Sequence, residues 1–230
     1  TQSRSSAASD VYKRQANCSI VDGKLESTVA GTCSVRATKA ASTNFTAIVS
    51  APQTITITKL NQDVRFTSTV PVFPVASGTY DLVATASSTL PVTFSITTGL
   101  NTVCRFDPQN PARVQFLIAG DCDVRATQAG DGAFKPANMT QSIVVGALNQ
   151  TILFAPIADK PFGTPAFLAA ATSNSGLPVT YTLGAATTNQ ACSVASNGLI
   201  ELLAAGTCEI YADRAGNATY SAASQVMQKF

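Results

Sequence analysis

The 230-residue sequence contains no histidine and no tryptophan, and only 12% of its residues are charged. Without histidine, the usual general base and the Ser-His-Asp arrangement are absent. Zinc sites are disfavoured as well, because the chain also lacks a Cys-x-x-Cys pattern. No apolar run approaches the ~20 residues that a membrane-spanning helix needs. We therefore expect no enzyme of the common hydrolase types, no metal or cofactor site and no membrane span.

One stretch of sequence occurs three times, at residues 17–45, 103–134 and 191–220. The second cysteine of each copy stands at position 33, 122 or 208, so the successive differences are 89 and 86. A period of this length describes one small β domain rather than one turn of a solenoid. The sequence thus predicts tandem copies of a single domain type.

Each copy carries the pattern of a hairpin followed by a half-buried strand. The dipeptides Asp22-Gly23 and Asn197-Gly198 lie between short apolar runs and favour a tight hairpin turn. After the second cysteine the residues alternate between apolar and polar, as in Cys208 to Asp213. This alternation is typical of an antiparallel sheet with one face buried.

The six cysteines fall in equivalent pairs, with the first of each pair on this hairpin and the second at the start of the strand that follows it. Counting back from the turn places both sulfurs of a copy at the same end of its domain, within bridging distance. The predicted disulfides are Cys18–Cys33, Cys104–Cys122 and Cys192–Cys208. Loops of this length correspond to about 3 kcal/mol of stabilisation per bridge. The alternative is six buried free thiols, since cysteine packs well as a small hydrophobe.

The predicted domain boundaries follow the repeats. Residues 1–15 are set aside as a non-native, disordered segment, because residues 5–15 resemble a translated sequencing adapter. Residues 16–50 are expected to be the C-terminal half of a truncated repeat. Complete repeats follow at residues 51–146 and 147–230. Removing the first fifteen residues leaves equal numbers of basic and acidic residues, so no nucleic-acid partner is expected.

The second repeat is predicted to open with the strand Gln53–Ile57 and to carry a ten-residue insertion within Lys59–Gly78. The reason is that Gln53 and Gln150 are 97 positions apart, whereas the proline-led strands at Leu90 and Leu177 are only 87 apart. The insertion contains an apolar strip that is our candidate contact loop, with the residues Val70, Val72, Phe73 and Val75. The alternative is an extra edge strand or a cover over a joint between domains.

Three carboxylates form the one local acidic cluster, Asp121, Asp123 and Asp131. A calcium site there would need the dense oxygen-ligand spacing of a known loop, which the cluster lacks. We interpret the three as solvated strand and turn acids.

Residues 16–230 resemble the bacterial immunoglobulin-like repeats that occur in tandem in large secreted and surface proteins, most closely in residues 147–230. The resemblance is carried by Gln150-Thr151-Ile152, by Ser-Gly-Leu-Pro-Val-Thr-Tyr at 175–181, by Ala-Gly-Thr-Cys at 205–208 and by Ala-Gly-Asn-Ala-Thr-Tyr at 215–220. It implies tandem immunoglobulin-like antiparallel β-sandwiches, export from a bacterial cell and a spacer or adhesive role. It brings no catalytic residue with it.

The sequence therefore predicts an all-β, non-catalytic spacer region of a bacterial extracellular or cell-surface protein, with a contribution to adhesion. The expected partners are neighbouring repeats of the same chain and a host or matrix glycan or protein. The alternative is a carbohydrate-binding accessory module of a secreted enzyme, and catalysis ranks last. An aromatic platform would favour the alternative, yet the chain has no tryptophan.

Overall fold

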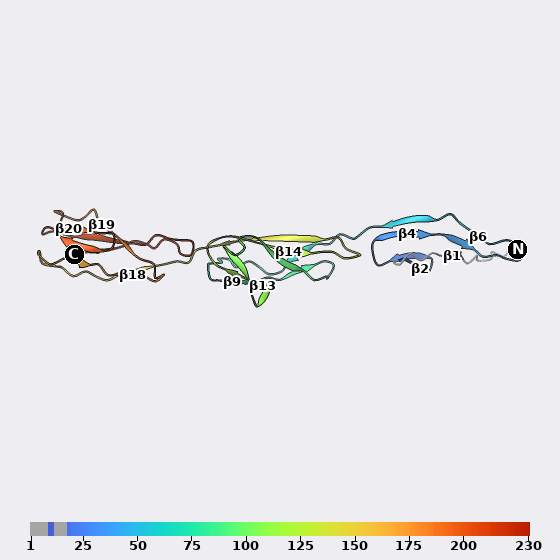
Figure 1. Ribbon diagram of the computed structural model, residues 1–230, viewed down its shortest axis with the longest axis horizontal. Helices are drawn as coiled ribbons and strands as arrows, with labels where there is room; N and C mark the ends of the chain where they lie inside the picture. Colours follow the sequence, from blue (N-terminus) through green and yellow to red (C-terminus); the bar gives the residue numbers. More distant parts are fainter. Residues whose placement is uncertain (1–8, 12–17) are drawn as a thin grey trace. The chain divides into compact units, whose positions relative to one another are not determined.

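The computed structural model describes residues 9–11 and 18–230 and is an all-β fold. Within those residues the chain forms 23 strands, β1 to β23, and no helix (Figure 1). The paired strands run antiparallel. The predicted fold class, tandem immunoglobulin-like antiparallel β-sandwiches, is therefore confirmed. Because the described part of the chain contains no helix, it holds no helical membrane span.

The chain divides into two compact units that do not coincide with the repeats. The first unit contains the described residues up to Ser68 together with Val83–Ser95 and Arg125–Gln141. The second unit contains Thr69–Leu82, Ile96–Val124 and Ser142–Phe230. Strands β11 (Thr93–Thr98), β14 (Gly120–Gln128) and β15 (Ala137–Val145) contribute residues to both units and form one sheet in the order β11-β14-β15.

The first unit contains the hairpin of β2 (Cys18–Val21) and β3 (Lys24–Ser27). Its two-residue turn has φ values of 51° at Asp22 and 75° at Gly23, so the predicted tight turn is confirmed. Strand β5 (Ala37–Lys39) lies between β1 (Ser9–Val11) and β6 (Ile48–Val49). The rest of the segment set aside as non-native, residues 1–8 and 12–15, lies outside the described residues, and its origin stays a prediction.

Strand β7 (Gln53–Ile57) pairs with β4 (Gly31–Val35), and Cys33 stands opposite Ile55. The strand therefore completes the sheet of the first repeat. Its predicted role as the opening strand of the second repeat is wrong, and so is the boundary at residues 50 and 51. Pro52, which cannot donate to a ladder, lies in the break between β6 and β7.

The second repeat opens instead at β8 (Val64–Phe66), which pairs with β10 (Ala84–Ala86). The third repeat has the same arrangement in β16 (Ile152–Phe154) and β18 (Ala171–Ser173). The tripeptide Leu-Asn-Gln precedes both opening strands, at 60–62 and at 148–150, and these positions differ by 88. This spacing agrees with the other repeat distances, so the predicted ten-residue insertion is not needed.

Apolar residues of the first unit gather between these strands. Val64, Ala86 and Ala126 are buried there, and the rings of Phe66 and Phe94 stack with their centroids 6.1 Å apart.

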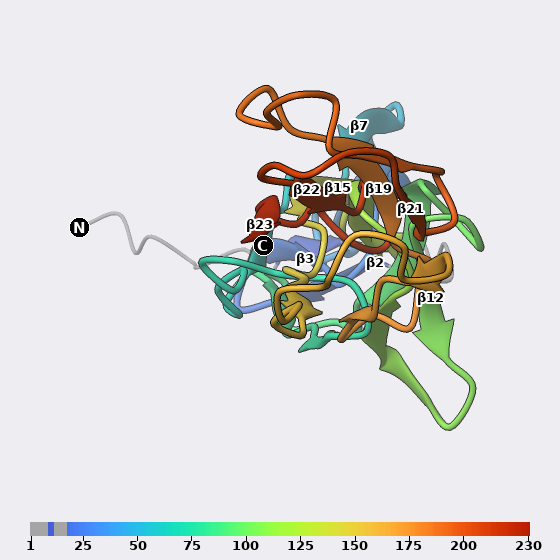
Figure 2. The ribbon, with the colours of Figure 1, turned by 90° about the vertical axis from the view of Figure 1, so that its left-hand side faces the viewer.

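The second unit begins with a three-stranded sheet. Its order is β12 (Cys104–Asp107), β13 (Asn110–Phe116) and β9 (Thr79–Asp81). Figure 2 shows β12 and β13 side by side as a hairpin. Only Pro108 and Gln109 separate these two strands, and the Asp107 carboxylate accepts the Gln109 N–H at 2.9 Å.

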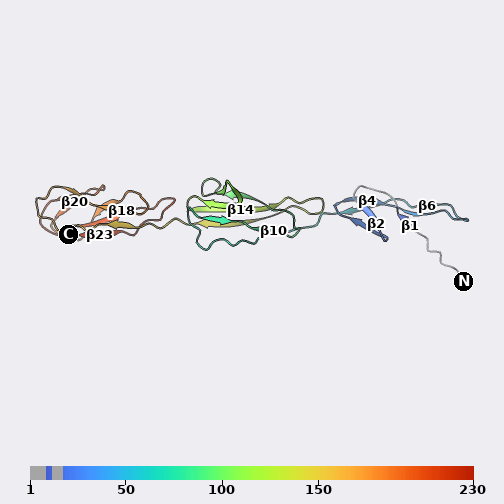
Figure 3. The same ribbon diagram turned by 90° about the horizontal axis from the view of Figure 1, so that it is seen from below.

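The third repeat, which lies entirely in the second unit, has two three-stranded sheets beside the β16–β18 pair (Figure 3). One sheet has the order β17 (Phe167–Leu168), β21 (Leu199–Leu202), β20 (Cys192–Val194). The other has the order β19 (Thr180–Leu183), β22 (Glu209–Asp213), β23 (Val226–Lys229). Both sheets contribute to one buried core, which includes Phe154, Tyr181, Ile200, Ile210 and Ala212. Two sheets that share one core form a β-sandwich.

Candidate functional site at the joints between repeats

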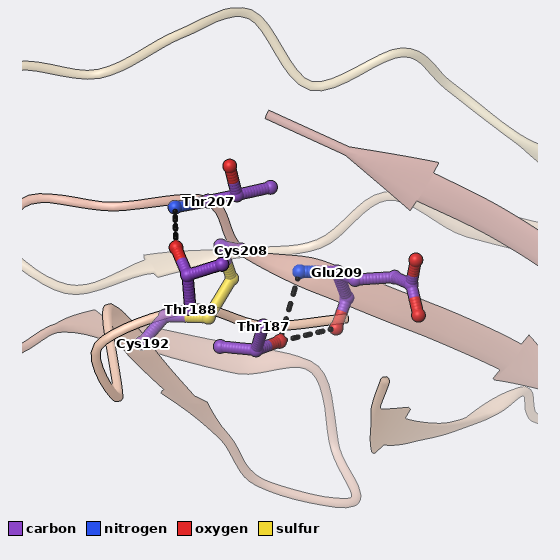
Figure 4. Close-up of a disulfide and its surroundings, with 6 residues drawn as sticks. All are labelled: Thr187, Thr188, Cys192, Thr207, Cys208 and Glu209. Carbon is purple, nitrogen blue, oxygen red and sulfur yellow. Dashed lines mark hydrogen bonds between the residues drawn. A yellow bond between two sulfur atoms is a disulfide. The ribbon is translucent and has the colours of Figure 1, made fainter. Parts of the chain in front are cut away.

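The structure contains all three predicted disulfides. Cys18 is bonded to Cys33, Cys104 to Cys122 and Cys192 to Cys208, with Cα–Cα distances of 6.2, 6.0 and 5.7 Å. In the third repeat the bridge ties β20 of one sheet to Cys208, the residue directly before β22 of the other sheet (Figure 4). The described chain has no free cysteine.

Buried glutamines at equivalent positions close the opposite region of the second and third repeats. The side chain of Gln150 is 4% exposed. Its Nε2 donates to the carbonyl oxygens of Ser221 at 2.7 Å and Ala215 at 3.3 Å. Its Oε1 accepts the hydroxyls of Ser173 at 3.1 Å and Ser175 at 2.5 Å. Every polar atom of this amide is therefore engaged.

Gln62 makes the corresponding contacts in the first unit. Its Nε2 donates to Gln128 Oε1 and to the Lys135 carbonyl, both at 2.6 Å, and Ser88 donates to its Oε1. Neither glutamine was predicted from the sequence, because Gln53 and Gln150 begin the same tripeptide and were taken as equivalent. The recurring Leu-Asn-Gln tripeptide was the signal that would have found them.

A tight turn follows the cysteine strand in each repeat. In the second repeat Asp131 Oδ1 accepts the N–H groups of Ala133 and Phe134, each at 2.8 Å. These bonds lower the pKa of Asp131 below its usual value, because they stabilise the carboxylate. Asn217 Oδ1 accepts the equivalent N–H groups of the third repeat, also at 2.8 Å. Asp131 and Asn217 therefore stabilise their turns in the same way, because in each turn one side-chain oxygen accepts two backbone N–H groups.

The first repeat has the same turn at Ser42–Phe45. Ser42 N–H donates to the Phe45 carbonyl at 2.9 Å, and the Phe45 N–H donates back at 3.2 Å. We call three segments the asparagine-type turns: Ser42–Phe45, Asp131–Phe134 and Asn217–Tyr220. The name is taken from Asn217, whose side-chain oxygen binds its turn in the same way as that of Asp131.

The asparagine-type turn of one repeat contacts the Ala-Gly turn of the repeat before it. In the first unit the Ala30 N–H donates to the Gly132 carbonyl at 2.8 Å. In the second unit the Ala119 N–H donates to the Ala218 carbonyl, also at 2.8 Å. Ala30 and Ala119 both stand three residues before the second cysteine of their repeat. The same backbone bond therefore forms both joints.

The strand that enters the next repeat is fixed to the same turn. The Leu60 N–H donates to the Ala133 carbonyl at 2.7 Å, and its carbonyl accepts the Lys135 N–H at 2.8 Å. Leu148 makes the matching bonds with Thr219 at 2.7 Å and Ser221 at 2.8 Å. At each joint the chain passes from one repeat into the next, and three backbone hydrogen bonds hold the two turns and the connecting segment together.

The predicted contact loop has an exposed tip and fixed ends. Val72 and Phe73 are 83% and 85% exposed, whereas Val70 and Val75 are half-buried. Backbone bonds connect Gly146 to the carbonyl of Pro74 at 2.7 Å and bridge it to Val75. The segment forms no strand, so the edge-strand alternative is wrong. Whether the tip binds a partner stays a prediction.

Two of the three acids of the predicted cluster, Asp123 and Asp131, have separate structural partners. Hydroxyls of Ser142 and Thr98 hydrogen-bond Asp123 and lower its pKa. Asp131 serves the turn described above. Among the residues that the structure describes, no group of three or more potential metal ligands comes together.

Comparisons with known proteins give similarity to solved structures only. No family model matches the chain, and no curated protein matches it. One similar structure is protocadherin gammaB7 EC3-6, at 12% identity and a TM-score of 0.34, covering 97% of this chain and 66% of that one. Drosophila N-cadherin EC1-4 has 12% identity, a TM-score of 0.31 and coverages of 96% and 66%. Surface layer protein SbsC, domains 1-6, has 14% identity and a TM-score of 0.31, and this chain spans 98% of its own length and 35% of that chain.

Proposed function

We propose that this chain is a non-catalytic, load-bearing repeat region of a bacterial extracellular or cell-surface protein. The main support is that the same joint occurs twice. The Ala30 N–H donates to the Gly132 carbonyl and the Ala119 N–H donates to the Ala218 carbonyl, both at 2.8 Å. Disulfides within all three repeats support export, because such bonds persist in oxidising compartments. Repeated domains joined in the same way suit a spacer that sets the distance between other parts of a protein.

Each disulfide limits how far its repeat can lengthen under load. The Cys192–Cys208 bond prevents the segment between these two residues, a sequence separation of 16, from extending when the repeat unfolds. At roughly 3.5 Å per extended residue this loop would add about 55 Å. Subtracting the 5.7 Å already spanned by the two Cα atoms leaves a gain of roughly 50 Å.

Single-molecule force spectroscopy on the full chain tests this function. The oxidised chain should unfold in discrete steps. The double variant Cys192→Ser, Cys208→Ser should lengthen only the step of the third repeat, by roughly 50 Å. Its matched control is the double variant Cys104→Ser, Cys122→Ser, which should lengthen a different step. A chain that extends without discrete steps would contradict a load-bearing role.

A second candidate function is adhesion through the tip of the contact loop. Val72 and Phe73 are more exposed than any other large apolar residues of the described chain. An exposed, proline-flanked apolar tip is a common contact surface for a protein or glycan. A glycan array and a cell-binding assay should detect binding that the variant Phe73→Ser abolishes. The control variant Phe162→Ser, which changes a different exposed phenylalanine (67% exposed), should preserve the binding. Binding that is insensitive to both would favour the carbohydrate-binding module with a different site.

A further inference from the structure

The third repeat carries an Ala-Gly turn of its own, at residues 204–207. Ala205 stands three residues before Cys208, as Ala30 and Ala119 stand before their cysteines. Ala30 and Ala119 are half-buried under the next repeat, whereas Ala205 is exposed. In the described part of the chain the Ala205 N–H donates no hydrogen bond, although its two counterparts donate at 2.8 Å.

The turn is held rigidly around this free N–H group. The Thr207 N–H donates to Thr188 Oγ1 at 2.8 Å (Figure 4). The Thr188 N–H donates to the Thr207 carbonyl at 2.9 Å. The Ala191 carbonyl accepts the N–H groups of Leu203 and Ala204 at 2.8 and 3.3 Å. The neighbouring disulfide fixes Cys208 as well. A preorganised surface loses little entropy when a partner binds.

A cavity of about 350 Å³ lies beside Ala205. Its wall includes Phe162, Leu202, Ala204, Gly206 and Phe230. Ala204 occupies the position of Val29, whose methyl group lies within 2.6 Å of where a Cβ on Gly132 would be. The first joint therefore pairs a large residue with glycine. In the second joint Ile118 holds this position and the incoming turn carries Ala218, so a large residue there also accommodates a methyl group. The smaller Ala204 leaves more room than either Val29 or Ile118.

We propose that residues 204–207 and the adjoining cavity are a docking surface for the asparagine-type turn of a further repeat of this kind. This inference rests on the proposed structural function. The Ala205 N–H would donate to the carbonyl at the position of Gly132 and Ala218. A side chain at that position, such as the methyl group of Ala218, would enter the space beside Ala204.

The position of the partner in the chain follows from the strand register. Phe230 exchanges two backbone hydrogen bonds with Cys208, and Ile55 stands opposite Cys33. Leu60 follows Ile55 by five positions. A segment of residues 144–230 attached directly after Phe230 therefore places its own Leu148 at the correct distance for a third joint.

Amide hydrogen exchange on a segmentally labelled protein tests the proposal. The full chain carries ¹⁵N and is ligated to an unlabelled second copy of residues 144–230. We expect the Ala205 amide to exchange at least about tenfold more slowly than in the chain alone, approaching the protection of Ala119. The control ligates a Gly/Ser tail of equal length, which should leave Ala205 unprotected.

Equal Ala205 exchange with the second copy and with the tail would overturn the proposal. If the attached copy did not fold, unlabelled chain would be titrated into the labelled chain to ~1 mM, a concentration at which weak contacts are still visible. This presents the turn Ser42–Phe45 in trans, a turn that has no Ala-Gly turn of another repeat against it among the described residues. A concentration-dependent shift of the Ala205 amide supports the proposal, and its absence overturns it. If the chain unfolds in discrete force steps but the attached copy does not slow the exchange of the Ala205 amide, the docking surface alone is rejected. If the Ala205 amide is protected but the chain extends without discrete force steps, the spacer function alone is rejected.

Discussion

Replacing Gln150 with leucine tests the buried glutamine that closes the third repeat. Leucine has a similar volume but offers neither donor nor acceptor. The substitution removes four hydrogen bonds, to Ala215, Ser221, Ser173 and Ser175. It leaves two hydroxyls and two carbonyl oxygens without this partner in a place where the amide itself is 4% exposed.

The expected loss of unfolding free energy is about 3 kcal/mol. Each intramolecular hydrogen bond contributes about 1 kcal/mol, which gives about 4 kcal/mol for the set. The partners are only half-buried or more exposed, so water replaces part of this. For a domain of this size the loss corresponds to a fall in Tm of roughly 10–20 °C.

The assay is thermal unfolding of the oxidised chain, with amide exchange of Ile210 and Ala212 reporting the third repeat specifically. The matched control is Gln225→Leu, because Gln225 is exposed and bonds only the exposed side of Asp213, at 2.9 Å. It should change Tm by a few degrees at most. Equal unfolding of the two variants would refute the reasoning.

Two further substitutions test individual turns. Gly198→Ala should lower the unfolding free energy by about 2–4 kcal/mol, because φ is +89° and the added Cβ would lie 2.7 Å from the Tyr181 ring. The control Gly176→Ala, at φ +71° with no atom near the added Cβ, should lower it by only about 1 kcal/mol. Equal urea midpoints of the two variants would contradict this. The Asp131 carboxylate has a lowered pKa because backbone N–H groups bind it, so its stabilisation is complete above pH 3.8, its ordinary value, and is lost as the pH falls through the lowered value. Asp131→Asn should keep the turn and flatten this acid limb of the stability profile, and an unchanged limb would argue against it.

The disulfides could be predicted because their geometry is local. The first cysteine of each pair lies on a hairpin whose turn fixes the register of its two strands, and the second cysteine follows shortly after that hairpin ends. The opening of the second repeat was predicted wrongly for the opposite reason. Gln53-Thr54-Ile55 matches Gln150-Thr151-Ile152 letter for letter, and only the long-range pairing of β7 with β4 distinguishes them.

The joints could not be predicted because they consist of backbone hydrogen bonds. Such bonds leave little trace in side-chain chemistry. The sequence does show small residues where two turns approach, such as the Ala-Gly turns and Gly132, where a Cβ would meet Val29. That pattern indicates close backbone contact without naming the partner.

The most direct test of the account is scalar coupling across the joint hydrogen bonds by NMR. We expect a through-bond correlation from the Ala30 nitrogen to the Gly132 carbonyl carbon and another from the Ala119 nitrogen to the Ala218 carbonyl carbon. Correlations within the strands β19 and β22 would serve as the internal reference. If those reference correlations are seen while both joint correlations are absent, the claim that one recurring contact joins the repeats is contradicted.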